Sequence, residues 1–315
     1  MGDKTGIEWT EATWNPVVGC SVISPGCTNC YAMKMAARLE RMGSPIYKGH
    51  TTQTKAGAVW NGKVSESNWG QVTLPLRWKK PRVIFANSMS DLFHKDMPAE
   101  TIERVFAVMA ITQRHTYQVL TKRADRMRAE VERIGKSIEI LERHAREMGY
   151  TLKFEGRGLV PWPLPNVWLG TSVEDRARAD ERIPLLLETA ATKRFLSCEP
   201  LLGPVSLARW CQHEYRPELG KHGDPCSVCG KSTSGLHHPA SFGALDWVIV
   251  GGESGKGARP MHPDWARTLR DQCQSAGVSF FMKQLGSAAK LRDRHGGDWT
   301  EWPVDLRIRE FPNAA

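Results

Sequence analysis

Six short apolar runs recur along this chain, and each of them leads into polar or glycine-rich residues. Runs of this kind that alternate with helix-like segments are typical of buried parallel strands joined by crossover helices. A further strand is expected near Trp14–Val18, which brings the number to about seven. We therefore predict an α/β fold, a β/α barrel that is partial or irregular. The six runs are Arg82–Ala86, Tyr117–Leu120, Val167–Gly170, Arg194–Leu196, Trp247–Val250 and Val278–Met282.

Helix-like segments lie between the runs. Ala99–Gln113, Asp175–Thr189 and Pro263–Ala276 are predicted helices, and proline is a suitable first helical residue in the last of them. Between residues 122 and 150, apolar or small residues recur at roughly helical spacing among many Arg and Glu residues. This segment is predicted to be one long, amphipathic, charged helix, and a solvated surface arm is favoured over a contact with a polyanion.

One segment interrupts the alternation. Residues 209–243 are polar and glycine-rich without a clear period, yet they are rich in cysteine and histidine. A C-x-H and a C-x2-C motif are able to close a tetrahedral zinc site, which would fold a segment that buries little apolar surface. A second metal cluster is the competing interpretation. The predicted zinc ligands are Cys211, His213, Cys226 and Cys229, with His237 or His238 as alternatives to His213.

These patterns give a domain organisation. The barrel is expected to comprise residues 1–208 and 244–315, with the long helix at 122–150 inside it and the small zinc-binding insertion at 209–243. A chain of 315 residues is long enough to bury a substantial core.

The composition favours an acidic partner. The chain has 43 Lys and Arg residues against 34 Asp and Glu residues, a formal net charge of +9. A positive excess of this size favours binding to a nucleic acid or a nucleotide. Several of the 12 tryptophans lie beside Pro or Gly, where they could stack on bases, although most are expected in the core. No apolar run approaches the length of a membrane span, so no membrane partner is expected.

Three cysteines lie within one short loop. Cys20, Cys27 and Cys30 occur in GCSVISPGCTNCYA, a segment bent by glycine and proline. Thiolates at this spacing can converge on one soft metal centre. A structural zinc site needs four ligands, whereas an iron–sulfur cluster held by three thiolates leaves one iron free for an outside ligand. The triplet therefore predicts an iron–sulfur cluster.

Other interpretations of the triplet are a zinc site, a disulfide, or inert buried thiols. The N-terminal segment is polar and contains no hydrophobic signal, so we expect a cytoplasmic protein, where disulfides are uncommon. Inert cysteines would not need to crowd one loop. Cys198 and Cys273 lie outside both cysteine groups and are predicted to be buried singly.

Carboxylates, hydroxyls and lysines follow nearly every predicted strand. In parallel β/α folds the chemistry lies at the carboxyl ends of the strands, and these side chains are sufficient to hold a polar ligand by its charged groups. Each one alone could also be a cap or a turn residue. The predicted cofactor-binding residues are Ser88, Asp91, Lys122, Thr171, Glu174, Glu199, Gly251, Gly252, Glu253 and Lys283.

The cysteine loop resembles a known class of enzymes. Gly19-Cys20, Ser24, Gly26-Cys27 and Cys30-Tyr31-Ala32 resemble the cluster loop of the radical S-adenosylmethionine enzymes, particularly those with Tyr-Ala after the last cysteine. They are closer still to an uncharacterised, mostly phage- and bacterium-encoded family with a GC-x5-GC-x2-CYA motif. The segments 166–172 and 246–255 extend this resemblance over almost the whole chain.

The resemblance implies a [4Fe-4S] cluster on Cys20, Cys27 and Cys30, and S-adenosylmethionine as a second cofactor. It also implies that a separate protein partner is encoded nearby. The x6 and x2 spacing departs from the usual x3 and x2, which weakens the link to the mechanism more than the link to the cluster. Gly251-Gly252-Glu253 resembles the motif that holds the methionyl amine in these enzymes, although here it follows a late strand.

The sequence indicates which type of side chain suits each group of S-adenosylmethionine, but not which individual residue binds it. Glu174, Glu199 and Glu253 are suited to the amine or the ribose hydroxyls, and Lys122, Arg123 or Lys283 to the carboxylate. We therefore expect a radical S-adenosylmethionine-like iron–sulfur enzyme that acts on a nucleobase or nucleic acid. The alternative is a zinc-stabilised nucleic-acid-binding or phage-defence module without radical activity.

Overall fold

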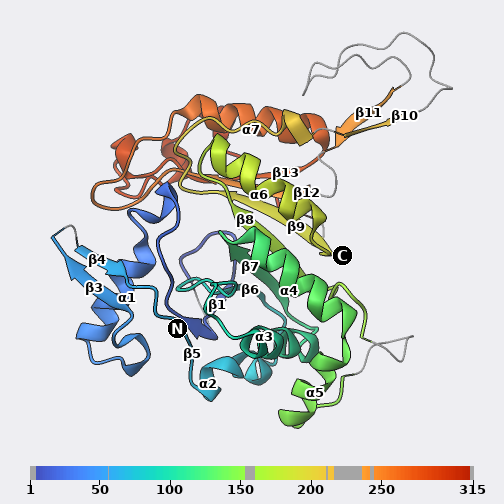
Figure 1. The fold of residues 1–315 in the computed structure, drawn as a ribbon. Coiled ribbons are helices and arrows are strands. Elements are labelled where there is room, and N and C mark those ends of the chain that lie inside the picture. Colours follow the sequence, from blue (N-terminus) through green and yellow to red (C-terminus); the bar gives the residue numbers. More distant parts are fainter. Residues whose placement is uncertain are drawn as a thin grey trace. The chain divides into compact units, whose positions relative to one another are not determined.

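The computed structural model describes residues 5–55, 57–152, 160–210, 212–215, 236–241 and 245–312, with the backbone alone for 212–215 and 236–241. The chain forms two compact units (Figure 1). The first contains Met1–Thr171 and Pro184–Thr192, and the second contains Ser172–Ile183 and Lys193–Ala314.

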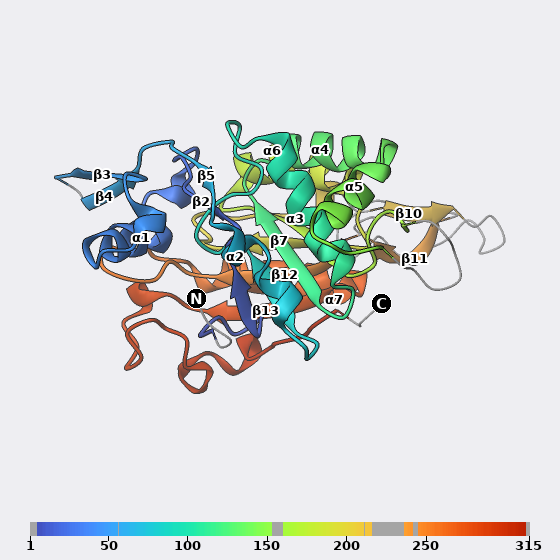
Figure 2. The same ribbon diagram turned by 90° about the horizontal axis from the view of Figure 1, so that it is seen from below.

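The first unit is built on four parallel strands in the order β1, β6, β7, β8. The central residues of β6, β7 and β8 are buried, as the apolar runs predict. The strands are joined through α3 and α4, which lie beside β6 and β7 (Figures 1 and 2). The bounds are β1 Ala12–Trp14, β6 Val83–Ala86, β7 Thr116–Thr121, β8 Val167–Ser172, α3 Ala99–Ile111, α4 Ala124–Lys136 and α5 Glu139–Glu147.

A second group of short elements lies between β1 and β6 in the sequence. β2 pairs antiparallel with β5, β3 and β4 form a hairpin, and α1 packs against this hairpin. Their apolar side chains form a small core of their own, to which Met33, Tyr47 and Trp60 belong. The bounds are β2 Val17–Val18, β3 Thr51–Thr54, β4 Gly57–Trp60, β5 Ser65–Glu66, α1 Tyr31–Arg41 and α2 Trp69–Val72.

The second unit contains three parallel strands in the order β9, β12, β13. α7 packs on β13 and β12; it begins with a proline at Pro263 and ends at Gly277, whose φ of 65° is left-handed. The remaining strands β10 and β11 pair antiparallel. The bounds are α6 Arg176–Glu188, which begins in this unit, β9 Lys193–Cys198, β10 Gln212–Tyr215, β11 Leu236–Ser241, β12 Leu245–Gly251, α7 Pro263–Ala276 and β13 Ser279–Gln284.

The predicted α/β class is confirmed. Each of the six apolar runs is a parallel strand, and the three helices between them begin or end within about two residues of the predicted bounds, the uncertainty usual for helix ends. The expected first strand is two short strands, of which only β1 joins the parallel sheet. Within the described residues, β1 pairs in parallel with β6 alone and β13 with β12 alone, so a closed barrel is not shown.

The prediction of one helix over 122–150 is wrong in this respect: the segment forms α4 and α5, separated at Ser137. Ser137 has φ −139° and ψ 60°, outside the helical region. The preceding Gly135 is required by packing, because a Cβ there would lie 2.3 Å from the indole nitrogen of Trp162. Spacing alone did not reveal this break, since the apolar positions continue on both sides of it.

The predicted zinc insertion falls largely outside the described residues. Cys211, Cys226 and Cys229 are outside them, and for His213, His237 and His238 only the backbone is described, in β10 and β11. The zinc site therefore stays a prediction.

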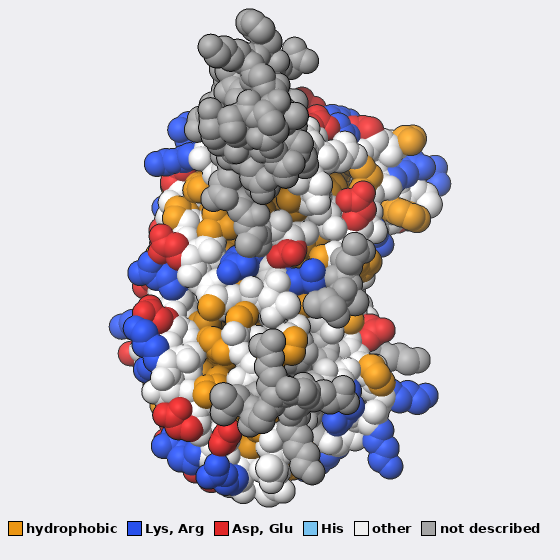
Figure 3. All heavy atoms as spheres, turned by 90° about the vertical axis from the view of Figure 1, so that its right-hand side faces the viewer, with side chains coloured by type: hydrophobic (Ala, Val, Ile, Leu, Met, Phe, Trp, Pro, Cys, Tyr) orange, Lys and Arg blue, Asp and Glu red, His pale blue; other side chains and the backbone are white. Residues whose placement is uncertain are grey.

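Charged side chains on the molecular face in Figure 3 are mixed in sign. There, Lys and Arg side chains are interspersed with Asp and Glu side chains. The net charge of +9 therefore does not identify a binding surface on this face by itself. None of the helices in the described segments has both the length and the hydrophobicity that are needed to cross a membrane.

Gly135→Ala tests the packing at the α4–α5 break. In an exposed helix this change would stabilise by about 1 kcal/mol, but here we expect it to lower the free energy of unfolding by about 1–3 kcal/mol, because the new methyl group overlaps Trp162. Gly70→Ala, inside α2, is the control, since its methyl group would only reach ordinary contact at 3.4 Å. Denaturant unfolding measures both. Equal stability of the two variants would contradict the packing argument.

Candidate functional site at the carboxyl ends of the strands

The cysteine loop, defined here as residues 19–30, follows β2 in the first unit. Gly19 has φ +90°, and a Cβ on it would lie 2.1 Å from the carbonyl oxygen of Lys63, so only glycine fits at this entry to the loop. A short 3₁₀ turn, Pro25–Cys27, follows, and its Cys27 N–H donates to the Ser24 carbonyl at 2.9 Å. Glycine and proline thus bend the loop as the sequence indicates.

The three cysteines of this loop are near one another. Cys20 and Cys30 are half-buried and pack against the same small apolar core, and the charge of Cys27 acts on Cys20. Cys30 immediately precedes the 11 residues of α1, where the positive end of the helix dipole favours negative charge. The loop therefore offers three thiols, one of them at a helix N-terminus.

A buried arginine joins the cysteine loop to the ends of β6 and β7. Arg123, just after β7, donates to the Asp91 carboxylate at 2.7 Å and to the Ser21 hydroxyl at 2.7 Å. Its guanidinium is also 3.7 Å from the sulfur of Cys20. The side chains of Arg123 and Asp91 are only 9% and 7% exposed, so the pair is protected from solvent.

This environment keeps Cys20 protonated in the metal-free protein. Desolvation, followed by the Asp91 carboxylate, raises the pKa of Cys20 to about 12, although Arg123 acts in the opposite direction. A metal that binds this sulfur must therefore displace its proton. The guanidinium of Arg123 is the described cation placed to stabilise the thiolate that results.

A buried histidine completes this network. The Nε2 atom of His94 is 2.8 Å from the Ser21 hydroxyl, and its Nδ1 accepts from the Asp96 N–H at 3.2 Å. Because Nδ1 accepts, the neutral ring carries its proton on Nε2 and donates to Ser21. Burial, followed by the charge of Arg123, lowers the pKa of His94 and favours this neutral form.

The loop after β6 lies against the cysteine loop. Ser90 forms an isolated parallel bridge with Gly19, and the Tyr31 hydroxyl, directly after the last cysteine, donates to the Ser88 carbonyl. The Ser88 hydroxyl exchanges hydrogen bonds with the Asn15 side chain at 3.1 and 3.3 Å. The predicted residue Ser88 is therefore beside the cysteine loop, with its hydroxyl already engaged.

The other predicted residues of the first unit differ in availability. Asp91 holds Arg123, and it also accepts from the Thr121 hydroxyl at 2.7 Å. The Thr171 hydroxyl is buried and donates to the Thr121 carbonyl at 3.0 Å, a structural role. The ammonium group of Lys122 has no ion-pair or hydrogen-bond partner among the described residues. Of the four, Lys122 is the group most able to meet a ligand.

In the second unit, each predicted glutamate is paired with a cation. Glu174 is fully buried with Arg182, at 3.1 Å. Glu253 receives both the backbone N–H and the guanidinium of Arg259, with Nε 3.0 Å away. These two carboxylates therefore bind neighbouring arginines.

Glu199 has a different kind of partner. It accepts from the ammonium of Lys283 at 2.6 Å and from the amide of Gln284 at 3.1 Å. Gly251 packs on this carboxylate, since a Cβ there would lie 3.3 Å from it. At Gly252 a Cβ would lie 2.1 Å from the Leu285 carbonyl, so glycine is required there by close contact with the loop after β13. The structure thus brings four of the predicted residues of this unit together.

The sequence interpretation missed four residues that hold these groups: Ser21, His94, Arg182 and Arg259. Arg259 is six residues after its glutamate and Arg182 eight residues after its own. Their positions gave no signal, because arginines are frequent throughout the chain.

Within the part of the chain that the structure describes, no group of three or more His, Cys, Asp or Glu side chains is placed to hold a single metal ion. The cysteine trio is not such a site. A [4Fe-4S] cluster sets a different requirement, because each of its cysteine ligands binds a separate iron. Each thiol of the loop would bind its own iron in such a cluster, and the cation beside Cys20 would offset the negative charge of its thiolate.

Asp91→Asn should strongly destabilise the first unit. The substitution leaves the Arg123 guanidinium buried without a charged partner, which we expect to cost about 3–5 kcal/mol of unfolding free energy. Glu100→Gln is the matched control, because it removes the carboxylate from a surface ion pair with Arg104 and should cost less than about 1 kcal/mol. Urea unfolding compares them, and similar losses would show that the buried pair is not a structural anchor.

Alkylation by iodoacetamide should separate the cysteines by burial. Cys198 and Cys273 are fully buried, as predicted, but they are not isolated, because the charge of Cys198 acts on Cys273. Desolvation raises the pKa of Cys198 from 9.0 to about 12. At pH 8 this shift lowers the thiolate fraction of Cys198 about a thousandfold. In the folded, metal-free protein we expect Cys30 to be modified long before Cys198 or Cys273, as measured by peptide mass spectrometry.

The denatured protein is the control for this experiment, and there all cysteines should react at similar rates. Modification of Cys198 as fast as that of Cys30 in the folded protein would contradict the buried environment.

Comparison with known proteins identifies relatives for nearly the whole chain. The model of a family described as a protein of unknown function, DUF5131, matches residues 4–302. Searches of curated proteins and of solved structures gave no match.

Proposed function

Because this chain belongs to the DUF5131 family, whose function is unknown, its activity has to be argued from its own residues, and we propose that it is a radical S-adenosylmethionine-type iron–sulfur enzyme. In this proposal Cys20, Cys27 and Cys30 hold a [4Fe-4S] cluster. The substrate is a nucleobase or a nucleic acid, which the net charge of +9 favours.

The observation that carries the proposal is the pairing of the cysteine loop with Arg123. Three thiols lie on one glycine-bent loop, and a buried guanidinium is 3.7 Å from the sulfur of Cys20. The guanidinium of Arg123 serves Asp91 and also reaches a thiol. A cluster with negatively charged thiolates would be stabilised by this cation and by the α1 dipole, because both offset that charge.

A cluster held by Cys20, Cys27 and Cys30 would supply one-electron chemistry: reductive cleavage of S-adenosylmethionine to methionine and a 5′-deoxyadenosyl radical, which would take a hydrogen atom from the substrate. The residues of this chain have other tasks. Arg123 holds the thiolate of Cys20 in its charged form, and His94 and Asp91 fix Ser21 and Arg123 in position. Lys122 offers a cation at the end of β7 for a carboxylate or a phosphate.

The pair Glu199–Lys283 in the second unit is chemically suited to an amino-acid head group. Both side chains are partly exposed, at 19% and 17%, and they attract each other at 2.6 Å. A zwitterion can replace both halves of such a pair, since its ammonium binds the glutamate and its carboxylate binds the lysine. We propose that this pair binds the ammonium and carboxylate groups of a zwitterionic ligand.

Anaerobic purification and reconstitution test the proposal. We expect about four iron and four sulfide per chain, a brown colour, and release of 5′-deoxyadenosine from S-adenosylmethionine under reducing conditions. Cys27→Ala should lose all three signals, whereas the control Cys273→Ala removes a buried cysteine outside the loop and should keep them.

The absence of both cluster and 5′-deoxyadenosine from reconstituted wild-type protein would overturn the proposal. Metal analysis that finds zinc alone would support the alternative, a zinc-stabilised nucleic-acid-binding or phage-defence module without radical activity. In that case Cys226→Ser, within the C-x2-C motif, should lose the zinc.

A further inference from the structure

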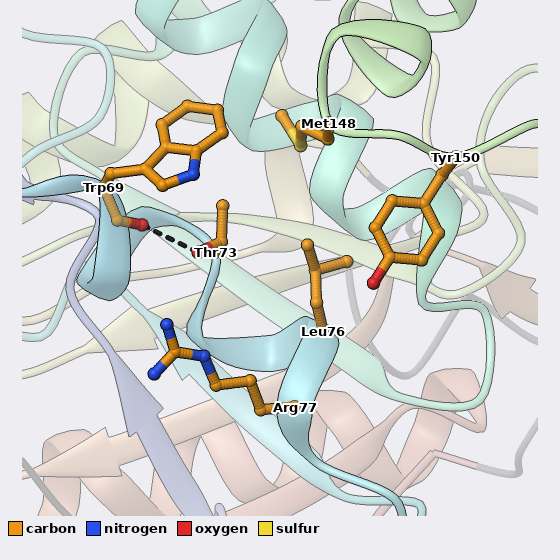
Figure 4. A pocket seen from close by; sticks show the side chains of 6 residues that line it. All are labelled: Trp69, Thr73, Leu76, Arg77, Met148 and Tyr150. Atoms are coloured by element: carbon orange, nitrogen blue, oxygen red, sulfur yellow. Dashed lines mark hydrogen bonds between the residues drawn. The ribbon is translucent and has the colours of Figure 1, made fainter.

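A hollow of about 220 Å³ opens on the surface of the first unit, away from the cysteines in sequence. We call it the aromatic hollow. One wall is α2 with the 3₁₀ turn Leu74–Arg77, and the other is the segment that follows α5. Figure 4 shows its lining side chains, which are Trp69, Thr73, Leu76, Arg77, Met148 and Tyr150.

Two large aromatic rings line this hollow and are exposed to solvent. Trp69 is 52% exposed and Tyr150 is 42% exposed, whereas most of the tryptophans described are buried. The two rings lie on opposite sides of the hollow in Figure 4, and the Tyr150 hydroxyl points inward. Neither the indole N–H of Trp69 nor this hydroxyl has a hydrogen-bond partner among the described residues. Exposed aromatic faces with free polar edges are the features by which proteins bind unpaired bases.

Hydrogen bonds hold the backbone on both walls of the hollow in place. Gly149, with φ +82°, ends α5, and the Tyr150 N–H returns to the Ala145 carbonyl at 2.9 Å while the Gly149 N–H bonds to Arg146. This pair of bonds is the Schellman arrangement, which fixes the residue after the glycine. The other wall is anchored through the buried Trp14, whose indole donates to the Gln71 carbonyl at 2.8 Å.

The charged side chains beside and after α2 are cations without ion-pair partners among the described residues. The side chain of Arg77 is exposed, and its guanidinium lies beside Gly70, since a Cβ there would be 3.8 Å from it. Lys79 and Lys80 follow and are exposed as well. None of these three cations has an ion-pair partner among the described residues. On the opposite wall Glu147 is occupied by the buried His144, at 2.9 Å.

We propose that the aromatic hollow binds single-stranded nucleic acid: one base stacks on Trp69 and Tyr150, and Arg77, Lys79 and Lys80 bind neighbouring phosphates. A duplex does not fit this chemistry, because its bases are stacked on each other and cannot enter a hollow between two side chains. A protein partner would have to supply acidic groups to three cations and an apolar side chain in the hollow, whereas a nucleic acid supplies both in every nucleotide.

The wall that carries the cations runs along the flank of the parallel strands. At one end, the Ser67 hydroxyl donates to the Asn15 carbonyl, directly after β1. At the other end, Arg114, just before β7, donates to the carbonyls of Trp78 and Pro75. The segment therefore connects the carboxyl ends of the strands, where the cysteine loop lies, to their amino ends. A nucleic-acid strand bound in the hollow would therefore lie outside the proposed reaction centre.

Fluorescence anisotropy with labelled, mixed-sequence RNA and DNA oligonucleotides of about 12 nucleotides tests this inference. We expect wild-type protein to bind the single strands and to bind the matching duplex at least about tenfold more weakly. Trp69→Ala and Tyr150→Ala should each weaken binding about tenfold, whereas Tyr150→Phe, which keeps the ring, should change it less than about threefold. Arg77→Gln should reduce the slope of log affinity against log salt by about 0.7.

Matched controls lie in the second unit. Trp299→Ala removes a tryptophan that is 45% exposed, and Arg294→Gln removes an exposed arginine; both should leave binding unchanged. Binding by Trp69→Ala and Tyr150→Ala that equals wild type, equal affinity for the duplex, or no binding to either single strand would overturn the inference. The last outcome would leave the hollow to a protein or a small molecule.

This inference rests on the nucleic-acid substrate class of the proposed function, but it does not need the radical chemistry. The binding assay contains no S-adenosylmethionine and is repeated with Cys27→Ala, which cannot hold the proposed cluster. Binding by Cys27→Ala without 5′-deoxyadenosine release by wild type would remove the enzyme proposal alone. Release of 5′-deoxyadenosine by wild type without binding of either single strand would overturn the inference about the aromatic hollow alone.

Discussion

The buried guanidinium of Arg123 is the contact on which the carboxyl end of the first unit depends. Its partners, Asp91, Ser21 and Cys20, come from two loops that are distant in sequence, one after β6 and one after β2. A buried charge is tolerated only when oppositely charged and hydrogen-bonding groups surround it. The arginine after β7 therefore holds these two loops to a third. The cysteine loop is fixed by this ionic contact in addition to the apolar packing of Cys20 and Cys30.

The sequence predicted the strands and crossover helices well because both depend on local patterns. A strand buried on both faces is a continuous apolar run, as Trp247–Val250 shows. The features that escaped prediction depend on contacts between distant residues. The glycine at position 135 of α4 is required by Trp162, which comes 27 residues later and occupies the space of its side chain. No helical period contains that information.

The candidate site was predicted in part for the same reason. Strand-end carboxylates are visible in the sequence, but whether a carboxylate faces a ligand or a neighbouring cation is not. Glu174 and Glu253 hold Arg182 and Arg259, and Asp91 holds Arg123, so these acids position other groups first. Glu199 is bound instead by a lysine and an amide. A lysine is a point charge on a flexible stem, so a ligand can displace it more easily than a bidentate arginine. An acid at a strand end that is paired with an arginine therefore has a structural role, and it can bind a ligand only if that arginine moves away.

The functions proposed for the aromatic hollow and for the cysteine loop make opposite demands on the same unit. Radical chemistry needs a closed environment in which the reacting atom is held close and water is excluded. Capture of a flexible strand needs open rings and unpaired cations, which a closed centre cannot offer without a desolvation cost. Trp69 and Tyr150, exposed at the flank, meet the second demand, and the buried Arg123 network meets the first. If both proposals hold, separating the two functions along one chain segment would let the protein bind a polymer in one place and react with one nucleotide in another, because tethering raises the local concentration of the remaining nucleotides.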